Sequence, residues 1–203
     1  SPPIVVDLVP GSQFRYSGGG YLVMQQAVQD VTGLAYADYM RQRVLEPIGM
    51  STSTYEPPLP DSLQDSAASG YYADGAAVPG GHHIYPELAA ASLWTTSSDL
   101  ARFLIELQLS LRGESNRVLN VENAELLVTE VKRNYGLGFD LWSHRGRPYF
   151  GHDGANDGFR CRMVASRSLG YGVVILTNSD RASEMFDALV TLIGEREGWP
   201  GYQ

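Results

Sequence analysis

Residues 151–159 read Gly-His-Asp-Gly-Ala-Asn-Asp-Gly-Phe, and this stretch decides how the rest of the chain is interpreted. Two aromatic residues precede it. Apolar residues alternate with Arg160 and Arg162 after it, which is typical of a strand with one buried face. The three glycines allow the backbone to approach other groups closely. Two interpretations stay open here: a functional site that carries His152, or an irregular connection between strands whose polar groups satisfy one another.

Length and composition set the outer limits. A chain of 203 residues with 43% hydrophobic and 19% charged residues is ordinary for a globular domain that buries a core. A net charge of -8 argues against a nucleic-acid partner, because no basic stripe is present to neutralise phosphates. No apolar run is long enough to span a membrane. The single cysteine, Cys161, excludes a disulfide within the chain, and Lys132 is the only lysine.

The first residues resemble the interior of a longer protein. The chain begins Ser1-Pro2-Pro3, without a methionine or a signal peptide, and continues directly into the apolar segment 4–11. We therefore expect a preceding segment. The cellular location stays open between the periplasm and the cytoplasm of a bacterium.

Helical periodicity dominates the first two thirds of the chain. A helix that ends at Thr32-Gly33 has four apolar residues on one face, Met24, Ala27, Val28 and Val31. A second helix is predicted over 36–46. The glycine-rich segment 16–20 starts the first helix, where free backbone N–H groups could hold a polar ligand. The alternative is a tight turn with Tyr16 packed as a core aromatic residue.

A long stretch without periodicity, residues 56–93, is predicted to wall a site or to form a lid. It contains His82-His83, but adjacent histidines without an i+4 partner do not predict a metal site. The sequence Thr96-Ser97-Ser98-Asp99 then predicts a capped helix. The core stripe of that helix is Leu100, Phe103, Leu104, Leu107 and Leu111. Asn120 is predicted to cap a shorter helix.

The last third changes to strands. We predict strands over 139–142, 149–150, 159–165 and 171–177, and a final helix that ends before Gly198. The continuous apolar run 173–176 indicates a strand that is covered on both faces. The predicted fold is therefore α+β: a mostly helical and loop region over 1–134, then antiparallel strands with a packed C-terminal helix over 135–203.

Four motifs in this order carry a resemblance to a known family. They are Tyr16-Ser17-Gly18, the stretch 90–103 (Ala-Ala-Ser-Leu-Trp-Thr-Thr-Ser-Ser-Asp-Leu-Ala-Arg-Phe), Tyr135-Gly136-Leu137-Gly138-Phe139 and Gly151-His152-Asp153-Gly154. Together they resemble the serine β-lactamase and penicillin-binding protein family, in the class C-like branch with D-aminopeptidases and esterases. The resemblance covers nearly the whole chain, which would be the C-terminal part of one β-lactamase-like domain.

The resemblance implies a mechanism with three motifs. A serine in Ser-x-x-Lys forms an acyl-enzyme, a tyrosine moves the proton, and a strand motif lines the site. Tyr16 matches the tyrosine, and His152 and Gly154 match the strand motif. The backbone N–H of Ala155 would join the oxyanion hole, where one donor is worth about 3 kcal/mol. Tyrosine acts as a base only where cations stabilise the phenolate, because its ordinary pKa is about 10.

This chain departs from the family pattern at two places. Gly18 stands where the family usually has asparagine; Asn156 could supply an amide to the substrate instead. No Ser-x-x-Lys is present, so the nucleophile would belong to polypeptide outside this chain. The missing segment, or a dimer-mate, would then cover an exposed edge of the sheet.

Three functions are compatible with these residues. The first is a serine hydrolase acting on amides, lactams or esters, inactive as this fragment alone; His152 in place of lysine favours an esterase or peptidase. The second is a non-catalytic protein of the same family that binds peptides or cell-wall fragments. The third is an unrelated metal hydrolase that uses histidine. The first two need a small-molecule or peptide ligand and no cofactor or metal. The hydrolase interpretation requires Tyr16 and His152 to face each other.

Overall fold

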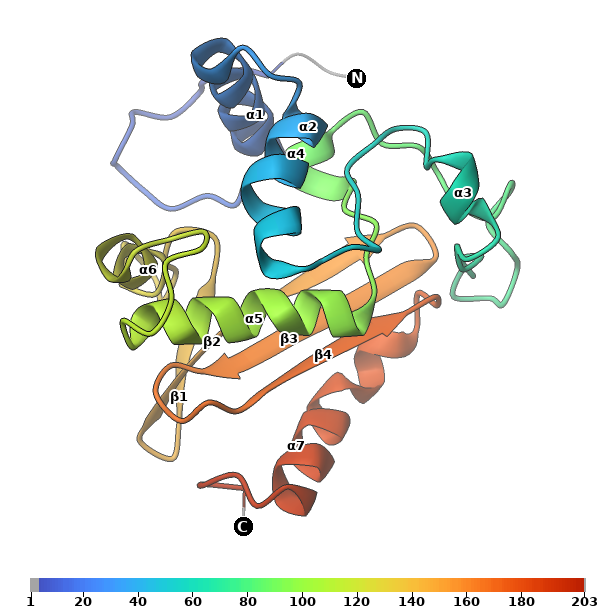
Figure 1. Cartoon of the computed structure of the whole chain (residues 1–203). Coiled ribbons are helices and arrows are strands. Elements are labelled where there is room, and N and C mark those ends of the chain that lie inside the picture. Colours follow the sequence, from blue (N-terminus) through green and yellow to red (C-terminus); the bar gives the residue numbers. More distant parts are fainter. Residues whose placement is uncertain (1–3, 203) are drawn as a thin grey trace.

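The computed structural model describes residues 4–202, so Ser1-Pro2-Pro3 lies outside the described residues. Helices come first, and a four-stranded antiparallel sheet of order β1-β2-β3-β4 follows, with a C-terminal helix (Figure 1). The predicted α+β class is confirmed. The strands are β1 (Asp140–His144), β2 (Arg147–Asn156), β3 (Phe159–Ser166) and β4 (Gly172–Thr177). The helices are α1 (Gly18–Thr32), α2 (Tyr36–Met40), α3 (Asp61–Gln64), α4 (Leu88–Ala91), α5 (Ser97–Leu111), α6 (Val121–Leu127) and α7 (Phe186–Arg196).

The sheet is the middle layer, with α5 on one face and α7 on the other (Figure 1). The core on the α5 face includes Leu104, Leu107 and Phe150, with Val174 packed against it. The core on the α7 face includes Tyr149, Val190 and Trp199, with Val173 and Ile175 packed against it. Strand β4 therefore contributes side chains to both cores, as its continuous apolar run predicts.

The stretch 151–159 is a regular hairpin and not an irregular connection. Strand β2 continues through Asn156, β3 begins at Phe159, and only Asp157 and Gly158 form the loop. Gly158 has a φ of +79°, which favours glycine at this turn position. The irregular-connection interpretation was wrong because His152, Asp153 and Asn156 project from a regular strand that pairs with β3 as far as Asn156.

The other two glycines of this stretch allow close packing within the sheet. A Cβ at Gly151 would lie 2.3 Å from the Met163 carbonyl oxygen. A Cβ at Gly154 would lie 2.4 Å from Sγ of Cys161, its partner on β3. Glycine is therefore required at these positions because neighbouring atoms already occupy the space of a side chain.

Helix α5 is fixed at its start by a buried carboxylate. Thr96 is the N-cap, and its side chain accepts a hydrogen bond from the Asp99 backbone N–H. The Asp99 carboxylate accepts hydrogen bonds from the Thr52 N–H at 2.9 Å, the Thr52 hydroxyl at 2.8 Å and the Ser53 hydroxyl at 2.9 Å. Asn120 caps α6 in the same way. Both predicted caps are confirmed.

Helix α1 ends at Gly33 as predicted, but its orientation is unexpected. Its amphipathic pattern predicts that the apolar face is buried. The structure leaves Met24 46% and Val31 87% exposed, whereas the polar residues Gln25 and Gln29 contact the rest of the chain. Gln25 accepts a hydrogen bond from the Ala89 N–H, and Gln29 accepts one from the Tyr36 N–H. Hydrophobic periodicity predicts which residues share a face of a helix, but it does not predict what that face packs against. Within residues 4–202, nothing covers the apolar face of α1 at Met24 and Val31.

The loop 56–93 has little regular structure, as predicted, apart from α3 and α4. The middle of this loop packs against the tip of the β2–β3 hairpin at Gly158. A Cβ at Gly158 would lie 2.8 Å from the Gly70 Cα, so two residues without side chains lie back to back. Gly70 donates to the Gly81 carbonyl at 2.7 Å and accepts from the Val78 N–H at 2.8 Å. These bonds close residues 70–81 into a small subloop.

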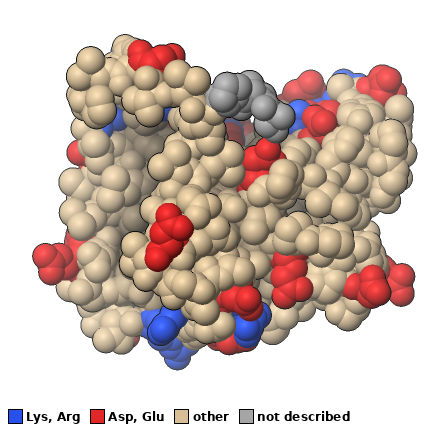
Figure 2. All heavy atoms as spheres, turned by 90° about the horizontal axis from the view of Figure 1, so that it is seen from above, with Lys and Arg blue, Asp and Glu red and all other residues tan. Residues whose placement is uncertain are grey.

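The surface agrees with the acidic composition. On the face seen in Figure 2, most atoms belong to uncharged residues, and acidic side chains are scattered between a few basic ones. No basic patch that would suit a nucleic acid is visible on this face. Across residues 4–202, no helix has the length and apolar character needed to cross a bilayer.

Candidate active site

Tyr16 and His152 lie in contact. Tyr16 stands just before the Ser17 N-cap of α1, and His152 projects from β2. The Tyr16 hydroxyl is 3.5 Å from Nε2 of His152, and the two rings stack with their centroids 6.0 Å apart. Tyr16 is 61% exposed, so the alternative that it is a core aromatic residue is wrong. The two side chains thus meet in the way that the resemblance implies.

A third ring, which the sequence did not single out as a site residue, completes this group. The Tyr135 ring lies 6.5 Å from both the Tyr16 ring and the His152 ring, edge-on in each case. Phe14 packs against it from the other side at 4.9 Å. Tyr135 begins the third motif of the resemblance, and that membership was the one available signal.

The electrostatic surroundings favour a neutral phenol at Tyr16. Burial raises the pKa of Tyr16, and the neighbouring Tyr21 and Asp140 raise it further. Burial and the same two neighbours, together with Tyr16, also raise the pKa of Tyr135. Each of these neighbours carries or acquires a negative charge, which disfavours a phenolate. A base role for Tyr16 therefore requires a cation that the described residues around it do not supply.

The remaining predicted site residues lie at the same end of the sheet. Gly18 is the first residue of α1, and no atom lies within 4 Å of where its Cβ would be, so a larger side chain would fit there. Strand β1 pairs with β2 only as far as Gly151. Among the described residues, the edge of β2 from His152 to Asn156 that faces away from β3 has no strand partner. Gly154 and the exposed Ala155 lie on this open segment.

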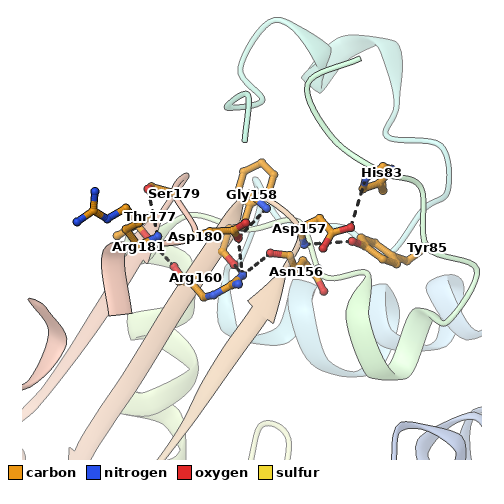
Figure 3. A network of polar contacts seen from close by, with 11 residues as sticks. His83, Tyr85, Asn156, Asp157, Gly158, Arg160, Thr177, Ser179, Asp180 and Arg181 are labelled. Atoms are coloured by element: carbon orange, nitrogen blue, oxygen red, sulfur yellow. Dashed lines mark hydrogen bonds and ion pairs between the residues drawn. The ribbon is translucent and has the colours of Figure 1, made fainter. Parts of the chain in front are cut away.

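Asn156 has a structural contact that the sequence could not show. Its Nδ2 donates to the Ala91 carbonyl at 2.8 Å, which ties the hairpin to α4. Figure 3 shows the neighbouring contacts at the hairpin tip: Asp157 lies 3.5 Å from Nε2 of His83, and its N–H donates to the Tyr85 hydroxyl. In the same figure Arg160 contacts Asp180 at 2.8 Å. The loop 82–92 is thereby held against the strand that carries His152.

A hollow of about 390 Å³ lies on the α7 side of the sheet and includes His152 but not Tyr16. Its wall is formed by β1, β2, β3 and α7, with Trp142, Arg162 and Tyr202 among the lining residues. Arg162 bridges Asp153 and Asp187 there. Residues 4–202 contain no group of three or more His, Cys, Asp or Glu side chains placed to bind a metal.

Comparisons with known proteins identify the family of this chain. Residues 3–196 match the family described as Beta-lactamase, and the chain belongs to that family. It is 25% identical to Penicillin-binding protein 4 of Amycolatopsis lactamdurans over 95% of this chain and 54% of that protein. It is 22% identical to a D-aminopeptidase of Brucella canis over 88% of this chain and 35% of that protein. The chain thus spans about half, or less, of the length of these relatives.

Solved structures show the same fold. The octameric penicillin-binding protein homologue from Pyrococcus abyssi superposes with a TM-score of 0.74 at 23% identity, over 91% of this chain and 44% of that one. The D-amino acid amidase from Ochrobactrum anthropi SV3 gives a TM-score of 0.70 at 23% identity, over 84% of this chain and 51% of that one. At these identities the likeness concerns the fold alone.

Proposed function

We propose that this chain is the C-terminal portion of a serine hydrolase that forms an acyl-enzyme on amide, lactam or ester substrates. The observation that supports this most directly is the 3.5 Å contact between the Tyr16 hydroxyl and Nε2 of His152, at the open edge of β2. Members of this family need a phenol that moves a proton beside a strand that lines the scissile carbonyl. Two residues far apart in the sequence meet in that arrangement.

The proposed chemistry assigns a proton path to Tyr16. A serine hydroxyl attacks the substrate carbonyl, its proton passes to the Tyr16 phenolate, and the phenol then donates that proton to the leaving group. Water repeats the sequence to release the acyl group. His152 would hold the phenol oxygen in place, and backbone N–H groups on the open segment of β2, including that of Ala155, would stabilise the oxyanion.

The nucleophile and the cation are proposed to come from a preceding segment of the same protein. No Ser-x-x-Lys occurs in the chain, and the only lysine, Lys132, donates to the Ser12 carbonyl at 2.8 Å. A lysine next to Tyr16 would oppose the acidic neighbours that raise its pKa. The exposed apolar face of α1 adjoins Tyr16 along the chain, and a helix that carries serine and lysine would bury that face. Alternatively, a second copy of the chain in a dimer would bury this face of α1.

The test is covalent labelling with a fluorescent penicillin and a fluorophosphonate. We expect no labelling of the 203-residue chain alone, and labelling of a serine outside it when the preceding segment is supplied in the same polypeptide. The matched control is Tyr16→Phe in the longer protein, which should slow acylation by about 10²-fold or more. Labelling of the isolated chain would overturn the assignment of the nucleophile.

The second candidate function is a protein of the same family that binds peptides or cell-wall fragments without reacting. Gly18 favours it, because this position lacks the amide that catalytic relatives usually carry and has space for one. A preceding segment without Ser-x-x-Lys, together with peptide binding that leaves no covalent adduct, would establish this candidate and exclude the first.

A further inference from the structure

The rings of Tyr16, His152 and Tyr135 form a closed triangle. Its sides, measured between ring centroids, are 6.0 Å for Tyr16 and His152 and 6.5 Å for each pair that includes Tyr135. Edge-on contacts at this distance are favourable because the positive edge of one ring meets the negative face of another. Each of the two predicted catalytic side chains therefore contacts the same third ring as well as the other.

Of the two tyrosines in this triangle, Tyr135 has the more firmly held backbone. The Val131 N–H donates to its carbonyl at 2.8 Å, and its own N–H donates to the Lys132 carbonyl at 3.1 Å. The next residue, Gly136, lies directly against the Leu127 carbonyl oxygen, to which the Leu137 N–H donates at 3.1 Å; a Cβ at Gly136 would be only 2.1 Å from that oxygen. The backbone that carries Tyr135 is thus held on both sides.

Tyr16 lacks anchors of this kind. It is 61% exposed and lies in the extended arm before α1, where its neighbour Ser17 is the residue that caps the helix. The distance from the Tyr16 hydroxyl to Nε2 of His152 is 3.5 Å, which is long for a hydrogen bond. A second contact is needed to hold the phenol in one place, and the Tyr135 ring provides it.

We propose that Tyr135 is a positioning residue, whose ring fixes the Tyr16 phenol against the His152 imidazole. The inference rests on the proposed function, since it matters only where these two side chains act together. The Tyr135 hydroxyl is buried beside the Tyr21 side chain, and within residues 4–202 it makes no hydrogen bond to Tyr16 or His152. The role therefore belongs to the ring, and a phenylalanine preserves it whereas an aliphatic side chain does not.

The test uses the 203-residue chain and needs no turnover. The ¹⁵N resonances of the His152 imidazole are recorded with and without Tyr16→Phe, and the change in the Nε2 chemical shift measures the coupling of the two side chains. We expect Tyr16→Phe to move the Nε2 resonance in the otherwise wild-type chain, because it removes the hydroxyl that lies 3.5 Å from Nε2. The same shift should persist in Tyr135→Phe and fall to about a third or less in Tyr135→Leu.

Two controls accompany the NMR measurement. Tyr149 also has a buried hydroxyl without a hydrogen bond, but it packs on the α7 face, so Tyr149→Phe should leave the coupling unchanged. Urea unfolding followed by tryptophan fluorescence shows whether a variant is folded, because a folded variant unfolds in one cooperative transition. If Tyr135→Leu fails that check, Phe14→Ala removes the ring behind Tyr135 and should still weaken the coupling.

The proposal is overturned if a folded Tyr135→Leu or Phe14→Ala variant keeps the full coupling, or if Tyr16→Phe never moves the Nε2 resonance of His152. These outcomes are separate from the acylation test. A preceding segment that lacks the serine would end the hydrolase proposal while the coupling through Tyr135 stayed measurable.

Discussion

Adding a methyl group at Gly154 on β2 tests how closely this strand packs against Cys161 on β3. A Cβ at Gly154 would lie 2.4 Å from Sγ of Cys161, so Gly154→Ala forces the sulfur to move. Overpacking of this kind costs about 1–3 kcal/mol, and replacing glycine in an extended segment returns about 0.4–1 kcal/mol through the unfolded state. Because the sulfur ends a side chain that can rotate, we expect Gly154→Ala to lower the free energy of unfolding by about 1 kcal/mol.

Removing the sulfur should reverse that loss. Cys161→Ala alone should cost about 1 kcal/mol, because it leaves a small void in a partly buried position. The double variant has one methyl group on each strand and should be at least about 1 kcal/mol more stable than the sum of the single effects predicts.

Urea unfolding followed by tryptophan fluorescence measures all three variants. Gly18→Ala is the matched control, since no atom lies within 4 Å of its Cβ and alanine should be neutral or stabilising there. Strict additivity of the two changes at Gly154 and Cys161 would refute the argument that these side chains compete for one space.

Four further predictions follow from contacts described above. Asp99→Ala should cost about 3 kcal/mol, because it leaves three donors without their acceptor. Burial raises the pKa of Asp99, but the hydrogen bonds that the carboxylate accepts outweigh burial and hold that pKa below its ordinary value. The wild type should therefore be more stable than Asp99→Asn above about pH 4, and it should lose this advantage as the pH falls through the lowered pKa. Urea unfolding at a series of pH values measures the difference. Gly136→Ala should cost about 3 kcal/mol or more by thermal unfolding, because the atom it would strike is the Leu127 backbone oxygen, which cannot rotate away. The surroundings of Tyr16 raise the pKa of its phenol, so this phenol should ionise above pH 10. Spectrophotometric titration at 295 nm should show one ionisation above pH 10 in the wild type that is missing in Tyr16→Phe. If the missing ionisation instead lies below pH 10, the argument is wrong.

Local sequence signals predicted the elements well. The Thr96 and Asn120 caps, the end of α1 at Gly33 and the two-sided burial of β4 all depend on chemistry within a few residues. The hairpin was misread for the same reason: glycine and aspartate are typical of loops, and only the pairing partner on β3 shows that β2 continues.

Long-range contacts were beyond the reach of such signals. The pairing of Tyr16 with His152 followed only from the resemblance to a family, because no periodicity relates the start of a helix to a distant strand. Tyr135 was overlooked because a tyrosine in a glycine-rich loop looks like a packing residue until its neighbours are known. The sequence predicts that Asn156 supplies an amide to the substrate, but it could not show that Nδ2 of this residue donates to the Ala91 carbonyl.

The back-to-back glycines at the hairpin tip also bear on protein engineering. Gly70 packs against Gly158 and donates to the Gly81 carbonyl, which closes the two ends of the subloop 70–81. The turn at the far end of the subloop is exposed, and no atom lies within 4 Å of where a Cβ of Gly75 would be. Residues 73–75 are therefore a natural place to graft a foreign peptide or an affinity tag. Such a graft would project into solvent while the closed ends of the subloop kept its disturbance away from the strand that carries His152.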